Sequence, residues 1–61
     1  MEFDTYLTTK KIDADQFRQA EPDLYREWAA LFAQMHPDSF TAQKKFLINA
    51  IRRRYLVRLS N

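Results

Sequence analysis

The 61-residue sequence contains no glycine, and this absence restricts the structures that the chain can form. Walker-type and dinucleotide-binding loops need glycine where the backbone approaches phosphate closely or takes a positive φ. Two-residue hairpin turns of type I′ also depend strongly on glycine. The sequence therefore excludes nucleotide-binding loops of these kinds and predicts an all-α fold.

The length of the chain and its lack of cysteine restrict it further. Sixty-one residues are expected to make one domain, residues 1–61, with a small core. With no cysteine and a single histidine, neither a disulfide nor a structural zinc site can stabilise it. Hydrophobic residues make up 46% of the chain, so it should fold by dense packing or by self-association. We expect no catalytic site, metal, cofactor or small-molecule substrate.

Hydrophobic spacing predicts a small three-helix domain with a short helical turn before it. The turn lies near 3–9 and the main helices span about 13–20, 22–36 and 40–59. The predicted core combines the apolar stripes of these helices. Its members are Phe17, Leu24, Trp28, Leu31, Phe32, Met35, Phe40, Leu47, Ile48, Ile51, Tyr55 and Leu59.

Capping residues place the start of the helix at 13–20. Asp13 is expected to be its N-cap, and Gln16 falls where it would complete a capping box. Ile12 and Phe17 have the spacing of a hydrophobic staple around this cap. The next helix should start with Pro22, whose missing N–H is not needed at the first helical position.

The final predicted helix has a second apolar face. Phe46, Ala50 and Val57 project nearly opposite the stripe that contains Ile48 and Ile51. Such a face must meet another molecule or be covered within the chain. A symmetric homodimer is one possibility. The other, slightly favoured, is that the N-terminal segment around residues 3–7 folds across this face.

The tripeptide His36-Pro37-Asp38 resembles the motif on which J-domain co-chaperones depend. It also follows the second long helix, as in that family. The flanking residues differ, because the preceding helix carries Asp23 and Glu27 where a J-domain has a basic docking face. We therefore interpret His36 as a cap of the preceding helix, Pro37 as its end and Asp38 as part of the next cap. A J-like co-chaperone remains the second alternative function.

Basic residues gather in the final predicted helix and suggest a nucleic-acid surface. Three consecutive residues of a helix spread through about 200°, so the arginines should fan around the axis. Pairing with carboxylates of the other helices, and with the helix dipole, is the favoured interpretation. RNA or DNA binding is kept as the first alternative, through Lys44, Lys45, Arg52, Arg53, Arg54 and Arg58.

The segments EPDLYREW (21–28) and HPDSFTAQKKFLINAIRRRY (36–55) resemble a group of short bacterial proteins with no assigned activity. The resemblance covers most of the chain and implies a bacterial, cytoplasmic protein, without implying any site residue. The first four residues, MEFD, show neither a basic nor an apolar run, so no signal peptide or membrane span is expected. The sequence thus predicts a non-catalytic helical module for protein interaction or structure, with a protein partner or self-association possible.

Overall fold

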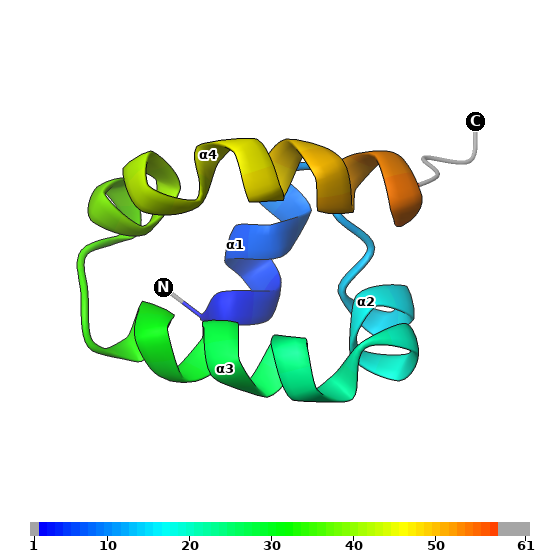
Figure 1. The fold of residues 1–61 in the computed structure, drawn as a ribbon, viewed down its shortest axis with the longest axis horizontal. Helices are drawn as coiled ribbons and strands as arrows, with labels where there is room; N and C mark the ends of the chain where they lie inside the picture. Colours follow the sequence, from blue (N-terminus) through cyan, green and yellow to red (C-terminus); the bar gives the residue numbers. More distant parts are fainter. Residues whose placement is uncertain (1, 58–61) are drawn as a thin grey trace.

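The computed structural model describes residues 2–57 and confirms an all-α fold. Within these residues the chain forms helices α1 (Phe3–Thr9), α2 (Ala14–Ala20), α3 (Pro22–Ala33) and α4 (Pro37–Arg54) (Figure 1). The short helix near 3–9 and the starts of the next two helices lie within one residue of their predicted positions. The start and the end of the last helix do not.

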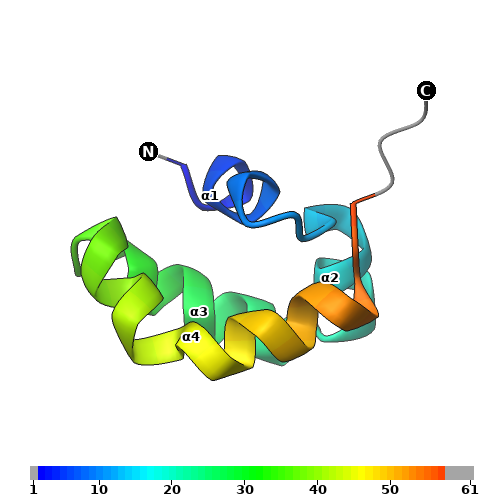
Figure 2. The ribbon, with the colours of Figure 1, turned by 90° about the horizontal axis from the view of Figure 1, so that it is seen from above.

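The helices form two layers. α3 and α4 lie side by side, and α1 crosses behind them with α2 at one end (Figure 2). α1 packs against α2 and α3, and α2 packs against α3. α1 and α2 therefore cover one face of the α3–α4 layer. No described helix covers its other face, which we call the free face.

Aromatic side chains make up most of the core. Eight of the nine aromatic residues form one connected network of ring contacts, in which Trp28, Phe32 and Phe40 join the helices. Edge-to-face rings of this kind add to the stabilisation gained from burial alone. The buried core consists of Tyr6, Leu7, Ile12, Phe17, Trp28, Phe32, Phe40, Ile48 and Ile51.

This core contains six of the twelve predicted members. Four further predicted members are only partly buried, namely Leu24, Leu31, Met35 and Tyr55. Leu47 was predicted wrongly, because its side chain lies on the free face of α4 and is 52% exposed. Leu59 lies outside the described residues. Tyr6, Leu7 and Ile12 were missing from the prediction although each is almost fully buried.

The α2 cap forms in part as predicted. The Asp13 carboxylate accepts a hydrogen bond from the Gln16 backbone N–H at 3.1 Å, and both Ile12 and Phe17 are fully buried. The capping box is not completed, because the Asp13 backbone N–H instead donates to the Tyr55 carbonyl at 2.6 Å. α2 is therefore fixed at its start by a contact with the far end of the chain.

The turn between α3 and α4 is shifted from its predicted place. α3 ends at Ala33 and not at 36, and α4 starts at Pro37 and not near 40. Pro37 occupies the first turn of α4, where its fixed φ suits the helix and its missing N–H costs nothing. His36 is consequently the N-cap residue of α4, with no hydrogen bond from its side chain to the helix.

The end of α4 also differs from the prediction. The helix stops at Arg54, five residues earlier than expected, because the following backbone pairs with the segment between α1 and α2. Ile12 and Leu56 form an antiparallel bridge, and the Val57 N–H donates to the Lys11 carbonyl at 3.0 Å. Lys11 takes a positive φ of 66°, which turns the chain from α1 into this pairing.

α4 bends at Lys44, whose φ of −105° and ψ of 15° depart from helical values. The bend is visible near the start of α4 in Figure 1. Just before it, the Thr41 hydroxyl bonds to the Pro37 carbonyl and to the Tyr6 hydroxyl, the latter at 2.5 Å. Bonds of a threonine side chain to the carbonyl four residues earlier often bend helices. The two parts of α4 can thereby bury both Phe40 and Ile48.

Candidate interaction surface

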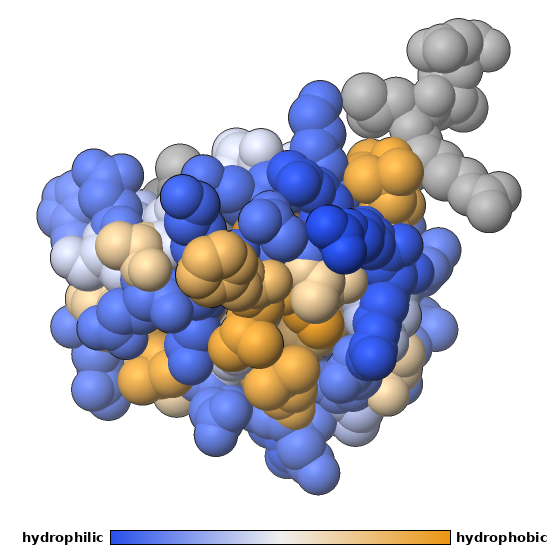
Figure 3. All heavy atoms as spheres, turned by 45° about the horizontal axis from the view of Figure 1, so that its top comes forward, coloured by the Kyte–Doolittle hydropathy of each residue, from blue (hydrophilic) through white to orange (hydrophobic). Residues whose placement is uncertain are grey.

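The free face of the α3–α4 layer carries large apolar side chains in contact with solvent. The Phe46 side chain is 82% exposed, and Leu47 and Ala50 are exposed beside it on α4. Phe46 is also the one aromatic residue outside the ring network. Figure 3 shows apolar atoms gathered in the middle of this side of the molecule, bordered by strongly hydrophilic side chains. We call Leu24, Phe46, Leu47 and Ala50 the apolar surface.

A groove of about 230 Å³ runs beside Phe46 between α3 and α4. Leu24 and Trp28 line it from α3, and Leu47, Ala50 and Ile51 line it from α4. An ion pair closes one end, where Arg54 lies 3.6 Å from Glu21. Glu21 also accepts a hydrogen bond from the Tyr55 hydroxyl at 2.8 Å, so this charged end is held by two contacts.

The predicted second face of α4 is only partly correct. Phe46 and Ala50 lie on it, whereas Val57 does not, because the helix has ended before Val57 is reached. Val57 instead borders a separate hollow of about 290 Å³, together with residues of the first half of the chain, including Asp4 and Ile12. The signal missed in the sequence is the backbone pairing of residues 55–57, which involves residues more than 40 positions away.

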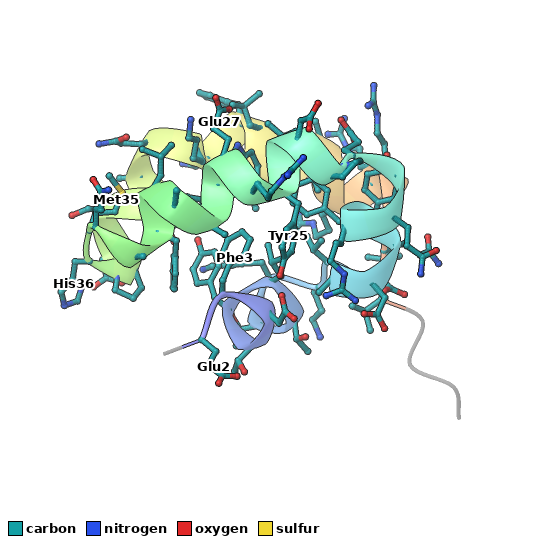
Figure 4. The ribbon with its side chains drawn as sticks, turned by 90° about the horizontal axis from the view of Figure 1, so that it is seen from below. Glu2, Phe3, Tyr25, Glu27, Met35 and His36 are labelled. Carbon is teal, nitrogen blue, oxygen red and sulfur yellow. The ribbon has the colours of Figure 1, made fainter. Side chains whose placement is uncertain are left out.

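The favoured prediction that the N-terminal segment covers Phe46 is wrong. Tyr6 and Leu7 of α1 are buried in the core on the opposite face of the α3–α4 layer. Figure 4 shows Phe3 and Tyr25 between α1 and α3, and Glu27 pointing away from α1 at the edge of the free face. Phe46 is therefore not covered by any described part of its own chain.

The basic side chains do not form one continuous stripe. Arg54 pairs with Glu21, and Arg52 donates to the Asn49 side chain at 3.1 Å. Lys45 and Arg53 are exposed, while Lys44 at the bend is half-buried. Arg53 and Arg54 line a third hollow of about 210 Å³ with Gln16 and Leu56. Arg58 lies outside the described residues.

The His-Pro-Asp segment lies at the end of the molecule remote from α2. His36 and Asp38 are exposed, and Pro37 is half-buried. Figure 4 shows His36 beyond the end of α3, near Met35 and away from Tyr25. These three residues lie at the start of α4, whereas Arg52, Arg53 and Arg54 lie in its last turn.

Carboxylates gather around Arg18 and Tyr25 on the α1–α2 side. Arg18 lies 2.6 Å from Asp15 and 3.6 Å from Asp4, and the Tyr25 hydroxyl donates to Asp4. The hydrogen bond to Asp4, and then burial, raise the pKa of Tyr25 above its usual value of 10.0. Among residues 2–57, no three His, Cys, Asp or Glu side chains lie close enough together to hold a metal ion.

Comparisons with known proteins found no similarity to this chain: no family model, curated protein or solved structure matches it. Over the described part of the chain, no helix is both long enough and apolar enough to cross a bilayer.

Proposed function

We propose that this protein is a non-catalytic helical module that binds another protein chain through its apolar surface. The observation that carries the proposal is the 82% exposure of Phe46 beside an apolar groove. Every other aromatic residue of the chain packs into the ring network, so the exposure of this one is specific to its position.

Energetic considerations support a binding role for this surface. Burying apolar surface gains roughly 25 cal/mol per Å². Phe46 is left in water in the monomer, so a partner that covers it would gain this free energy on binding. Aromatic residues and arginine are enriched at protein interfaces, and here Arg54 lines the groove while the exposed Phe46 precedes Leu47, which also lines it. The lining offers leucine, tryptophan, alanine and isoleucine side chains with one ion pair, a composition suited to an apolar anchor.

Photo-crosslinking in cells tests this proposal. A benzophenone amino acid at position 46 should form covalent adducts with a protein, whose mass identifies the partner. The matched control carries the same group at position 5, because Thr5 is exposed on α1 at the opposite face. We expect adducts from position 46 and not from position 5. Equal labelling from both positions, or no adduct from position 46, would contradict the proposal.

Nucleic-acid binding is a second candidate, supported by the exposed Lys45 and Arg53 and by the basic hollow at Arg53 and Arg54. Affinity for RNA or DNA carried by such residues should fall steeply between about 50 and 200 mM salt. Reversing Lys45 and Arg53 to Glu should then abolish it, whereas Phe46→Ala should leave it intact. No binding at low salt eliminates this candidate.

The J-like function rests on His36-Pro37-Asp38 alone and is tested by one substitution. In a J-like protein, His36→Gln removes stimulation of the ATPase of a heat-shock partner. At a simple helix start it changes only stability, and only slightly, because the His36 side chain makes no cap bond.

A further inference from the structure

We propose that the partner is a second copy of this chain, and that Phe46 of each copy inserts into the α3–α4 groove of the other. This inference rests on the proposed function and assigns the occupant of its surface. A two-fold symmetric contact requires one surface that is complementary to itself. The apolar surface and its groove meet that requirement in shape, in charge and in size.

The shape is complementary because a protruding ring and a recess lie on the same face. Phe46 projects into solvent with 82% of its side chain exposed. The adjacent groove holds about 230 Å³ and is lined mainly by apolar side chains. An apolar cavity of about 150 Å³ is enough to bind benzene in another protein, so this groove has room for a phenylalanine ring. Two-fold symmetry then forms this contact twice.

The charges are complementary because the two helices at the free face differ in sign. Glu27 is exposed on α3 and points to the free face (Figure 4). Lys45 is exposed on α4 and precedes Phe46 in the sequence. Neither has an ion-pair partner among residues 2–57. Insertion of Phe46 brings α4 of one copy over α3 of the other, so that Lys45 approaches Glu27 of the second copy.

The size of the face is also sufficient. The molecule measures 34 × 21 × 21 Å, so its long face has a projected area of about 34 × 21 Å, or roughly 700 Å². Stable interfaces bury about 600–1,000 Å² on each partner, so an interface that uses most of this face falls in the lower part of that range. A chain of 61 residues without disulfides has a small core of its own, and a dimer enlarges it by the aromatic ring that the monomer leaves in water.

Analytical ultracentrifugation of the purified full chain tests the inference, over about 1 µM to 1 mM protein. We expect a monomer–dimer equilibrium for the wild type. Phe46→Glu should raise the dimer dissociation constant about a hundredfold while its helical circular dichroism is retained. Thr5→Glu adds the same charge at the opposite face and should dimerise like the wild type. A wild type that stays monomeric throughout, or a folded Phe46→Glu variant that still dimerises, overturns the inference.

A charge exchange tests the orientation. Glu27→Lys alone should weaken the dimer severalfold, because it places two cations together, and the double variant with Lys45→Glu should restore it. Failure to restore overturns the proposed pairing. The two proposals fail separately: if the wild type is monomeric but position 46 crosslinks to a different protein in cells, the binding surface stands and self-association is wrong.

Discussion

The Tyr25 hydroxyl of α3 donates a hydrogen bond to the Asp4 carboxylate of α1, and so ties the two layers together at their edge. Arg18 of α2 approaches the same carboxylate and lies over the Tyr25 ring at 5.8 Å. The other two tyrosines also bond to residues far away in the sequence, Tyr6 to Thr41 and Tyr55 to Glu21. Each tyrosine thus joins segments that are distant in sequence while its ring contributes to the aromatic network.

These contacts predict that the fold loses stability in alkali. Hydrogen bonding to carboxylates raises the pKa of Tyr25 and Tyr55, and burial raises the pKa of Tyr6, in each case above 10.0. Above pH 10 the unfolded chain loses tyrosine protons that the folded chain still holds, so the free energy of unfolding falls as pH rises. The stabilisation from these protons is fully present below pH 10. Urea unfolding at several values between about pH 8 and pH 11 measures this fall.

Tyr25→Phe is the matched variant for that experiment. It should cost about 0.5–1.5 kcal/mol at neutral pH through the lost hydrogen bond and should make the alkaline fall shallower. A variant whose stability falls as steeply as that of the wild type would show that Tyr25 does not contribute to the pH dependence.

Trp28→Ala should remove a large part of the protein's stability. Trp28 is 1% exposed and contacts the rings of Phe17 and Phe40, so its removal leaves a large cavity at the centre of the network. Such truncations cost about 3–5 kcal/mol. A chain of this length has a total stability of only about 3–9 kcal/mol. Trp28→Phe keeps a ring and should cost less, which thermal unfolding at one fixed protein concentration will show.

Asp13→Ala should destabilise the protein by about 1 kcal/mol, because the first turn of α2 loses the acceptor for the Gln16 N–H. Asp13→Asn keeps a side-chain oxygen at the cap and should be close to the wild type. Chemical denaturation of the three proteins gives the comparison. If both variants lose equal stability, the charge of Asp13 matters more than its role as a cap.

Lys11→Gly should stabilise the protein. At φ 66° a side chain with a Cβ atom is strained by about 1–2 kcal/mol, and glycine removes the strain at a cost in unfolded-state entropy, leaving a gain of about 0.5–1 kcal/mol. Lys11→Ala removes the same side chain but keeps Cβ, and it should show no such gain. The melting temperatures of the two variants test this prediction. A glycine variant that melts no higher than the alanine variant would contradict it.

The parts of the fold that the sequence predicted correctly are those set by nearby residues. The Asp13 cap and Pro22 each act within one helical turn, and so α2 and α3 start where expected. The end of α4 depends on pairing with Ile12, which no local pattern indicates, and the apolar spacing through Tyr55 suggested a longer helix.

The candidate surface was also predicted only in part, because some of its residues depend on contacts between distant parts of the chain. Phe46 and Ala50 follow from helical periodicity alone. The exposure of Leu47 depends on the side of the α3–α4 layer to which α1 packs, and periodicity does not specify the side. Val57 was assigned to this face because the end of the helix was placed too late.

The bridge between Ile12 and Leu56 has a consequence for the order in which the protein is made and folds. Synthesis proceeds from the N-terminus, so α1, α2 and α3 are made before Ile48, Ile51 and the segment that pairs with Ile12. The aromatic rings of these first helices therefore lack their core partners from α4 at that stage, and the helices cannot reach the native arrangement one at a time. The native pairing of Ile12 requires residues 55–57, so nascent chains stalled before these residues leave the exit tunnel should be exposed to chaperones and proteases.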